Sequence, residues 1–327
     1  MAAASGATEA GGPGKDAQRT GQLMLLAVAA FYGSLNVMLR ALYALPGPPS
    51  ASALSVVRNL FIVLSFLPIF LSKSTPRLTG GFLLAALELS VWNLGAQGML
   101  NAGLLFTDAT RASFLTQTSV VLTPIVSLFA GEFVPKIVWA GCTLALAGVV
   151  ILSSADGTAA AAAASAGGFG WGDLLVLGGA LSWSMYIFRV GRIANRGFQA
   201  GALQAWKNVF LTGLYSLWLL VDVVRVGPGQ AHTLWAGWQN WVAWALLILS
   251  AVIPGTMADY FQNKGQESVN ASEANVILSS EPLWAAMLSA VFLSEVLSVK
   301  AWIGGSLIVL AALLSSGIFS KLKFKKA

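Results

Sequence analysis

Charged side chains are scarce in this sequence. Only 10% of the 327 residues are Asp, Glu, Lys or Arg, whereas 57% are hydrophobic. A soluble domain usually has about 25% charged residues. The chain therefore has too little polar surface to cover a water-soluble particle, which excludes an ordinary soluble domain.

Residues that carry enzyme chemistry are also scarce. His232 is the only histidine and Cys142 is the only cysteine, so an intrachain disulfide is excluded. The sequence contains no HExxH motif, no paired metal-ligand acids and no Gly-rich phosphate loop of the Walker type. We therefore expect no catalytic residue, no metal site and no cofactor, and a membrane-embedded enzyme is disfavoured. Any active transport must run on a gradient or on exchange.

Apolar blocks dominate what is present. Each block is about 20 residues long, the length at which an α-helix crosses a hydrocarbon core roughly 30 Å thick. The expected fold is all-α and polytopic, with ten transmembrane helices. The predicted spans are residues 22–45, 52–72, 81–101, 112–131, 136–154, 171–190, 203–222, 239–258, 273–293 and 300–319.

These spans divide into two sets of five. We predict a disordered cytoplasmic tail at 1–21, a first five-helix repeat at 22–154, an Ala/Gly-rich linker at 155–170, a second five-helix repeat at 171–319 and a basic cytoplasmic tail at 320–327. No soluble domain is expected outside the repeats, so function must lie among the helices.

Basic residues are distributed unevenly between the predicted loops. With a cytoplasmic N-terminus, thirteen of the nineteen Lys and Arg residues lie on the cytoplasmic side and four lie outside. This positive-inside bias predicts two cytoplasmic termini, as an even number of spans requires. Lys325 and Lys326 fit either a dilysine retrieval signal of the endoplasmic reticulum or a plain positive-inside anchor. The plasma membrane, the endoplasmic reticulum or Golgi, and a plastid membrane therefore all stay open.

Several short patterns occur twice. Arg58-Asn59 recurs 149 residues later as Lys207-Asn208. A second set recurs after 163 residues: Glu132, Trp139 and Gly141 as Glu295, Trp302 and Gly304. Because each half has an odd number of spans, the second half must cross the membrane in the opposite direction. Such inverted repeats are a recurring plan of secondary transporters, whose binding site lies between the halves near the midplane. The same plan also suits channels.

Each half ends in a motif that resembles one known family. The first copy runs from Ala112 to Pro124 and is followed by Gly131-Glu132, Gly141 and Gly148; the second has Ser279-Ser280-Glu281-Pro282, then Ser294-Glu295 and Gly304. Their order and duplication resemble the EamA-type members of the drug/metabolite transporter superfamily, over almost the whole chain. Ser294 departs from the glycine that is usual before the glutamate. The resemblance implies a ten-helix carrier of amino acids, other metabolites or drug-like compounds, with a central cavity lined mainly by the first four spans of each half.

Two basic residues lie inside predicted spans. Burying a charge in the bilayer costs about 2.5–3.5 kcal/mol even on the insertion scale, so Arg58 and Lys207 must face protein or water. Either they extend to an interface and have paired structural roles, or they attract an anionic group of a substrate, with Asn59 and Asn208 supplying hydrogen bonds. Their repetition in both halves fits either interpretation.

A polar stripe follows the third predicted span. Glu88 lies about eight residues into this span, and Trp92 follows it at the helical spacing of four. Asp259 is part of the counterpart stripe at the end of the eighth span, where it falls at the membrane interface. The predicted substrate-binding residues are Arg58, Asn59, Glu88, Trp92, Asn93, Gln97, Tyr186, Lys207, Asn208, Tyr260 and Asn263.

Two carboxylates are candidates for proton coupling. Glu88 lies in the stripe, and Glu281 lies near the middle of the ninth span, directly before Pro282. A carboxylate buried in the bilayer can bind a proton on one side and release it on the other. The alternative is a carboxylate that Arg58 or Lys207 neutralises for helix packing alone.

These features predict a secondary transporter that moves a small organic metabolite, an amino acid or a similar polar or anionic solute, by alternating access. A channel or receptor on the same helical scaffold is the alternative, and saturable flux distinguishes the two. The expected partners are a small-molecule substrate and the lipid bilayer. Gly141, Ala145 and Gly148 form a small-residue face for scaffold packing or for a homodimer. No nucleic acid is expected, because the net charge of +6 is explained by membrane anchoring.

Overall fold

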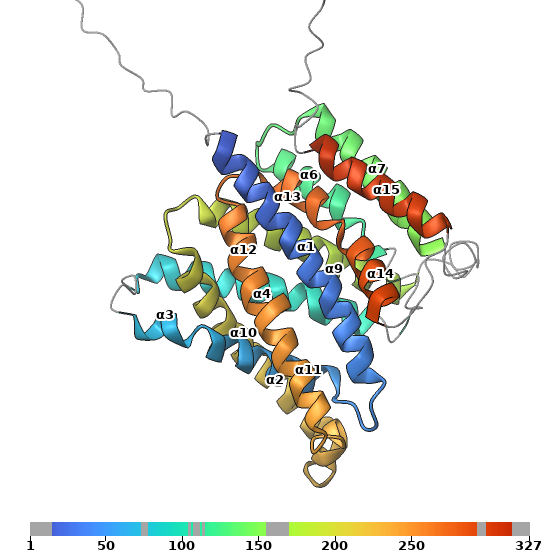
Figure 1. Cartoon of the computed structure of the whole chain (residues 1–327). Helices are drawn as coiled ribbons and strands as arrows, with labels where there is room; N and C mark the ends of the chain where they lie inside the picture. The colour runs from blue at the N-terminus through green and yellow to red at the C-terminus, as the bar shows by residue number, and fades with distance from the viewer. Residues whose placement is uncertain are drawn as a thin grey trace, which may run out of the picture.

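The computed structural model describes residues 15–72, 78–103, 106, 112, 115–154, 170–292 and 299–315, and all regular secondary structure within them is helical (Figure 1). The first half contains α1 (Lys15–Tyr43), α2 (Ala51–Ser65), α3 (Leu67–Leu71), α4 (Gly80–Gly103), α6 (Ser119–Phe129) and α7 (Lys136–Ser154). The second half contains α9 (Trp171–Ala194), α10 (Ala200–Val226), η1 (Pro228–Trp235), α11 (Trp241–Ala251), η2 (Val252–Met257), α12 (Ala258–Gly265), α13 (Ala271–Leu278), α14 (Glu281–Phe292) and α15 (Val299–Ser315). The predicted C-terminal tail, almost all of the predicted linker and the motif Ser294-Glu295 lie outside the described residues.

Several of these helices have the length and composition of membrane spans. Five segments of the described chain are long and apolar enough to cross a bilayer: Asp16–Tyr43, Trp171–Ala194, Ala200–Val226, Trp241–Gly265 and Ala271–Phe292. Four shorter apolar helices accompany them: Ala51–Ser65, Ser119–Phe129, Lys136–Ile151 and Trp302–Leu314. The chain is therefore an all-helical protein of the integral, multi-pass membrane type, as the sequence predicts.

α1 begins at Lys15, well before the predicted start at residue 22. Asp16 in its first turn interacts favourably with the helix dipole. The carbonyl of Ala17 accepts a 3.0 Å hydrogen bond from Ser268 Oγ, and Gln22 Nε2 donates to Glu273 Oε1 at 2.6 Å. These contacts fix the start of α1 against the turn that joins α12 to α13.

Prolines interrupt the long apolar segments of the second half. Pro254 lies in η2, a π-helical turn between α11 and α12, because proline has no N–H to continue the α-helical bonding. Pro282 follows the turn at Ser279 and Ser280 that separates α13 from α14. Both segments are thus discontinuous helices, and such breaks are tolerated inside a membrane only where protein or a cavity surrounds them.

Helices that are far apart in the sequence pack together. α7 packs along α15 and α4 along α9; α1 packs against α12 and α14, α10 against α2 and α4, and α6 against α9 and α13. Figure 1 shows α1 crossing the middle of the molecule, with the α7–α15 pair at one edge and α2, α3 and α10 toward the opposite side. Helices of both halves therefore surround the centre.

The α7–α15 pair is held close by small residues. A Cβ atom built on Gly148 would lie 2.7 Å from the Gly304 carbonyl oxygen and 2.8 Å from a side-chain carbon of Ile308. Cys142 and Ala145, on the same face of α7, are completely buried. Gly148 and Ala145 of the predicted small-residue face therefore pack within one chain, and the homodimer stays a prediction.

Gly148→Ala is expected to reduce the free energy of unfolding by about 1–3 kcal/mol, because the added methyl group meets backbone that cannot move aside. Thermal denaturation of the purified protein measures the change.

Gly213→Ala in α10 is the matched control, since a Cβ atom there would meet no atom within 4 Å. This control is expected to stabilise the protein by about 0.5–1 kcal/mol, because alanine favours the helix. Equal effects of the two changes would contradict the close packing of α7 on α15.

Candidate functional site

An ion pair lies in the interior of the helix bundle. Lys207 Nζ on α10 donates to Asp259 Oδ2 on α12 at 2.6 Å, and Asn208 Nδ2 donates to the same oxygen at 2.8 Å. Lys207 is only 1% exposed and Asp259 only 7%. Charges removed from water in this way are tolerated only when they are paired and hydrogen-bonded. The pair thus joins α10 to α12 at the centre of the molecule.

The two repeated dipeptides meet beside this ion pair. Asn59 Nδ2 on α2 donates to the Asn208 carbonyl oxygen and to Thr212 Oγ1, each at 2.8 Å. The Arg58 guanidinium donates to the Ser250 carbonyl oxygen at 3.2 and 3.3 Å and has no acidic partner among the described residues. The structure therefore brings together four of the predicted binding residues.

Aromatic rings form one wall of this region. The Lys207 ammonium lies 5.6 Å from the centre of the Tyr186 ring and 3.5 Å from its hydroxyl. Trp183 stacks on Tyr186 with ring centres 5.3 Å apart, and Tyr32 of α1 contacts Trp183 edge-on at 6.1 Å. A cation over an aromatic face is stabilised electrostatically. Tyr186, a predicted binding residue, is therefore part of the setting of the ion pair.

Amide groups of α12 remain unpaired next to the pair. Both amide atoms of Asn263 and the Nε2 of Gln262 are buried without a hydrogen-bond partner among the described residues, although Gln262 Oε1 accepts from the Tyr32 hydroxyl at 2.8 Å. A buried amide without a partner costs roughly 1–3 kcal/mol. Water or a polar solute at this level of α12 would remove that cost.

The two predicted coupling carboxylates have different partners. Glu88 on α4 forms an ion pair with Arg189 on α9 and accepts a 2.7 Å hydrogen bond from its guanidinium. Neither Arg58 nor Lys207, the two neutralising cations that the sequence suggested, pairs with it. Glu281 accepts a 2.8 Å hydrogen bond from Asn36 Nδ2 of α1.

The remaining predicted residues are placed less uniformly. Trp92 packs against the main buried cluster, and Asn93 lies close to the Tyr186 hydroxyl. Gln97, by contrast, is exposed. Tyr260 is 39% exposed and lines a cavity instead of contacting the ion pair.

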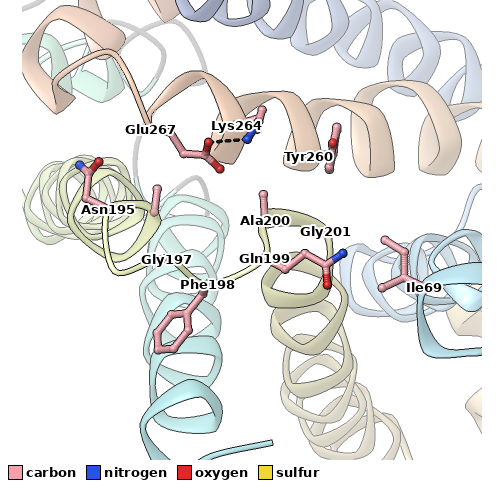
Figure 2. Close-up of a pocket in the computed structure, with 11 residues that line it drawn as sticks. Ile69, Asn195, Gly197, Phe198, Gln199, Ala200, Gly201, Tyr260, Lys264 and Glu267 are labelled. Atoms are coloured by element: carbon pink, nitrogen blue, oxygen red, sulfur yellow. Dashed lines mark hydrogen bonds and ion pairs between the residues drawn. The ribbon is translucent and has the colours of Figure 1, made fainter. Parts of the chain in front are cut away.

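This cavity has a volume of about 750 Å³ and lies where α9 ends and α10 begins, facing α12 (Figure 2). Its lining comprises Ile69, Ala194, Asn195, Gly197, Phe198, Gln199, Ala200, Gly201, Tyr260, Lys264 and Glu267. Lys264 and Glu267 form an ion pair of 2.5 Å along one side, as Figure 2 shows. Gly201 lies about 9 Å before Lys207 along the axis of α10, at 1.5 Å per residue. The cavity therefore lies at the start of α10, about 9 Å along this helix from the interior ion pair.

The helix that carries Asp259 continues past the predicted end of its span. The predicted eighth span stopped at residue 258, whereas the helical segment continues to Gly265, and α9 likewise continues past residue 190 to Ala194. Asp259 therefore lies within a helix, about two turns before its end, and forms a buried ion pair there. Lys207, a basic residue inside another predicted span, was the sequence signal that an acidic partner was needed.

Comparison with known proteins identifies the kind of protein that has this arrangement. The profile of the EamA-like transporter family matches the chain twice, over residues 19–154 and 170–317. An uncharacterized transporter of Archaeoglobus fulgidus is 29% identical over 215 residues, which are 65% of this chain and 62% of that protein. An uncharacterized transporter of Synechocystis sp. is 36% identical over 91 residues, 26% of this chain and 28% of that protein. The matches thus span less than two thirds of the length of these relatives.

A solved structure has the same fold. A crystal structure described only as that of a protein superposes with a TM-score of 0.72, covering 93% of this chain and 99% of that chain at 17% identity. At this identity the likeness concerns the fold alone.

Lys207→Ala is expected to destabilise the protein by about 3–5 kcal/mol, because it leaves the Asp259 carboxylate buried without its partner. The double change Lys207→Met with Asp259→Leu removes both charges and is expected to recover most of that loss. Thermal denaturation measures all three proteins.

Arg225→Ala is the matched control, since Arg225 is 75% exposed on the same helix and lies 3.9 Å from Asp222. Its expected effect is at most about 1 kcal/mol. A loss for Lys207→Ala as small as that of the control would show that the Lys207–Asp259 pair is not isolated from solvent.

Proposed function

The chain belongs to the EamA-like transporter family, and we propose that it is a secondary transporter that moves a small organic metabolite across a membrane by alternating access. The solute is an amino acid or a similar polar or anionic compound, and a gradient or exchange drives its movement. The observation that carries the proposal is the buried Lys207–Asp259 pair, surrounded by Asn59, Asn208 and Tyr186 where helices of both halves meet. Ionisable residues inside a membrane commonly mark the path of a solute.

We further propose ten spans arranged as two inverted repeats of five. The family profile matches once in each half. The packing of the helices also repeats when each helix is replaced by its counterpart in the other half. α1 packs against α12 and α14, and its counterpart α9 packs against α4 and α6. Counterparts also pack on each other: α2 on α10, α6 on α13 and α7 on α15. In proteins with inverted repeats the solute site lies between the halves near the midplane. We propose this location for the Lys207–Asp259 pair and its surroundings.

Discontinuous helices support the same location. In many secondary transporters the solute site is formed by transmembrane helices with a break near the midplane. Here η2 interrupts the segment that carries Asp259, and Gly255 of η2 packs so closely on α2 that an added Cβ atom would lie 2.7 Å from Ile62. A change at the ion pair can therefore be transmitted to α2 through this break.

The proposed solute contacts follow from the charges present. Arg58 and Lys207 attract an anionic group. The Asn59 side chain holds the backbone carbonyl of Asn208, and the Asn208 side chain holds the Asp259 carboxylate. The unpaired amide of Asn263 offers both a donor and an acceptor to a polar group of the solute. Glu88 and Glu281 stay predicted coupling residues.

Counterflow into liposomes tests the transport function directly. Vesicles that contain the purified protein and an unlabelled solute are diluted into the labelled form of the same solute. The panel is pyruvate, succinate and glutamate as anions, alanine and glutamine as zwitterions, and putrescine as a cation. We expect transient, saturable accumulation of at least one anion or zwitterion, reduced at least about tenfold in Arg58→Ala, because a lost charged contact is worth roughly 1.4 kcal/mol or more.

Unsaturable flux without counterflow would instead favour a channel. Absence of counterflow with every solute of the panel would contradict the proposal.

The proposed orientation places both termini in the cytoplasm, and cysteine labelling tests it. In a Cys142→Ser background, Thr233→Cys in η1 is expected to react with an impermeant maleimide from outside, because the loop between α10 and α11 is on that side. Arg196→Cys, in the turn between α9 and α10, is expected to react only after permeabilisation. Both positions are exposed, so the opposite pattern would reverse the proposed orientation.

A further inference from the structure

We infer that Asp259 carries the coupling proton of a proton–anion symport: the anionic group of the solute takes the Lys207 ammonium, and Asp259, released from Lys207, binds a proton. This inference rests on the proposed transport function. It assigns coupling to a residue outside the predicted set, and it narrows the solute to an anion that moves together with a proton.

Lys207 and Asp259 neutralise each other in the interior, and Glu88 and Arg189 form a separate neutral pair. Lys207 is only 1% exposed and Asp259 only 7%. A solute anion that takes the Lys207 ammonium therefore leaves the Asp259 carboxylate buried without the cation that now pairs with it, which is strongly unfavourable.

A net charge inside the bilayer is unfavourable, and a proton restores neutrality. Asp259 is the acid that must accept it. Its Oδ2 atom loses the Lys207 ammonium when the solute anion arrives, whereas Glu281 keeps its hydrogen bond from Asn36. Among the described residues, the group that still donates to Asp259 is the uncharged amide of Asn208.

The groups that face Asp259 from the helices packed around it offer no other compensation. α1 supplies the Tyr32 hydroxyl and α9 supplies the Tyr186 hydroxyl. α10 supplies Lys207 and Tyr215, and α2 supplies Arg58, whose guanidinium is hydrogen-bonded to the Ser250 carbonyl oxygen. Because its guanidinium is held on this carbonyl and makes no hydrogen bond to Asp259, Arg58 does not take the place of the Lys207 ammonium.

Polar groups of α12 give a proton a route to Asp259. Asp259 is only 7% exposed, and it is absent from the lining of the 750 Å³ cavity, which the adjacent residue Tyr260 does line. Asn263 lies one helical turn, about 6 Å, from Asp259 toward the cavity residue Lys264. Its unpaired amide and that of Gln262 can hydrogen-bond to water along this stretch. A proton can follow such a chain of water and amide groups.

The transfer balances simply. The Asp259 carboxylate takes one proton from water and becomes a neutral carboxylic acid, while Lys207 keeps its three protons and binds the anion. When the solute leaves on the other side, Asp259 returns the proton to water and the Lys207–Asp259 pair forms again. No oxidant or reductant is involved.

Solute-driven proton movement tests the inference in the liposomes described above. Pyranine inside the vesicles reports internal pH while an inward gradient of pyruvate, succinate or glutamate is imposed. The wild-type protein is expected to acidify the interior with whichever anion shows counterflow. Alanine, a zwitterion that brings its own positive charge, is expected to move no proton. In D259N the anion-driven acidification is expected to be lost. The matched control is D222N, an acid-to-amide change on the half-exposed acid of α10, which is expected to keep the acidification.

The outcomes separate this inference from the proposed function. Three outcomes would overturn the assignment and leave the transporter standing. The first is counterflow without acidification in the wild-type protein, and the second is anion uptake that requires sodium and moves no proton. The third is acidification that persists in D259N but is lost in E281Q. Absence of any counterflow would instead remove the proposed function itself.

A second measurement uses only the wild-type protein, so it stands even where D259N does not fold. A hydrophobic carbodiimide adds to the protonated form of a carboxyl group, and peptide mass spectrometry locates the adduct. Modification of Asp259 is expected to rise when the transported anion is added at fixed pH. Modification confined to Glu281, or modification of Asp259 that the anion does not change, would overturn the inference.

Discussion

A charge inside a lipid bilayer must have a partner, and the architecture of this protein follows from that requirement. Lys207 and Asp259 satisfy each other across α10 and α12, and Asn208 completes the coordination of the carboxylate. Because the interaction is buried on all sides, it constrains where both helices lie. The same requirement explains the Glu88–Arg189 pair, which joins α4 to α9. Each pair links helices that are distant in the sequence.

Polar side chains extend this constraint to neighbouring helices by bonding to backbone carbonyls. Asn59 of α2 donates to the carbonyl of Asn208, and Ser90 of α4 donates to the carbonyl of Lys207 at 2.7 Å. Arg58 reaches the carbonyl of Ser250 at the end of α11. The surroundings of the ion pair thus touch α2, α4, α10 and the broken segment of α11 and α12. A solute that separates Lys207 from Asp259 would change the balance among these helices, and discontinuous helices provide the places where movement is least costly.

Much of this arrangement follows from the sequence, and the exceptions have physical causes. Apolar length located the helices, because crossing a bilayer requires a fixed number of residues. Repetition of Arg58-Asn59 and Lys207-Asn208 pointed to residues that the structure brings together. Hydropathy cannot locate the end of a helix that continues through polar residues, so the predicted eighth span ended just before Asp259, whereas the helix continues to Gly265. Side-chain partners depend on how helices rotate against each other, which is why Glu88 pairs with Arg189 and why Gln97, on the predicted stripe, is exposed.

The most direct measurement of the central claim is an experimental structure of the protein in a lipid nanodisc with its transported anion bound. The account predicts density for the anion against the Lys207 ammonium, with the Asp259 carboxylate moved away from its present 2.6 Å contact. An anion bound elsewhere, with the Lys207–Asp259 contact intact, would contradict the account and reduce the ion pair to a structural link between α10 and α12.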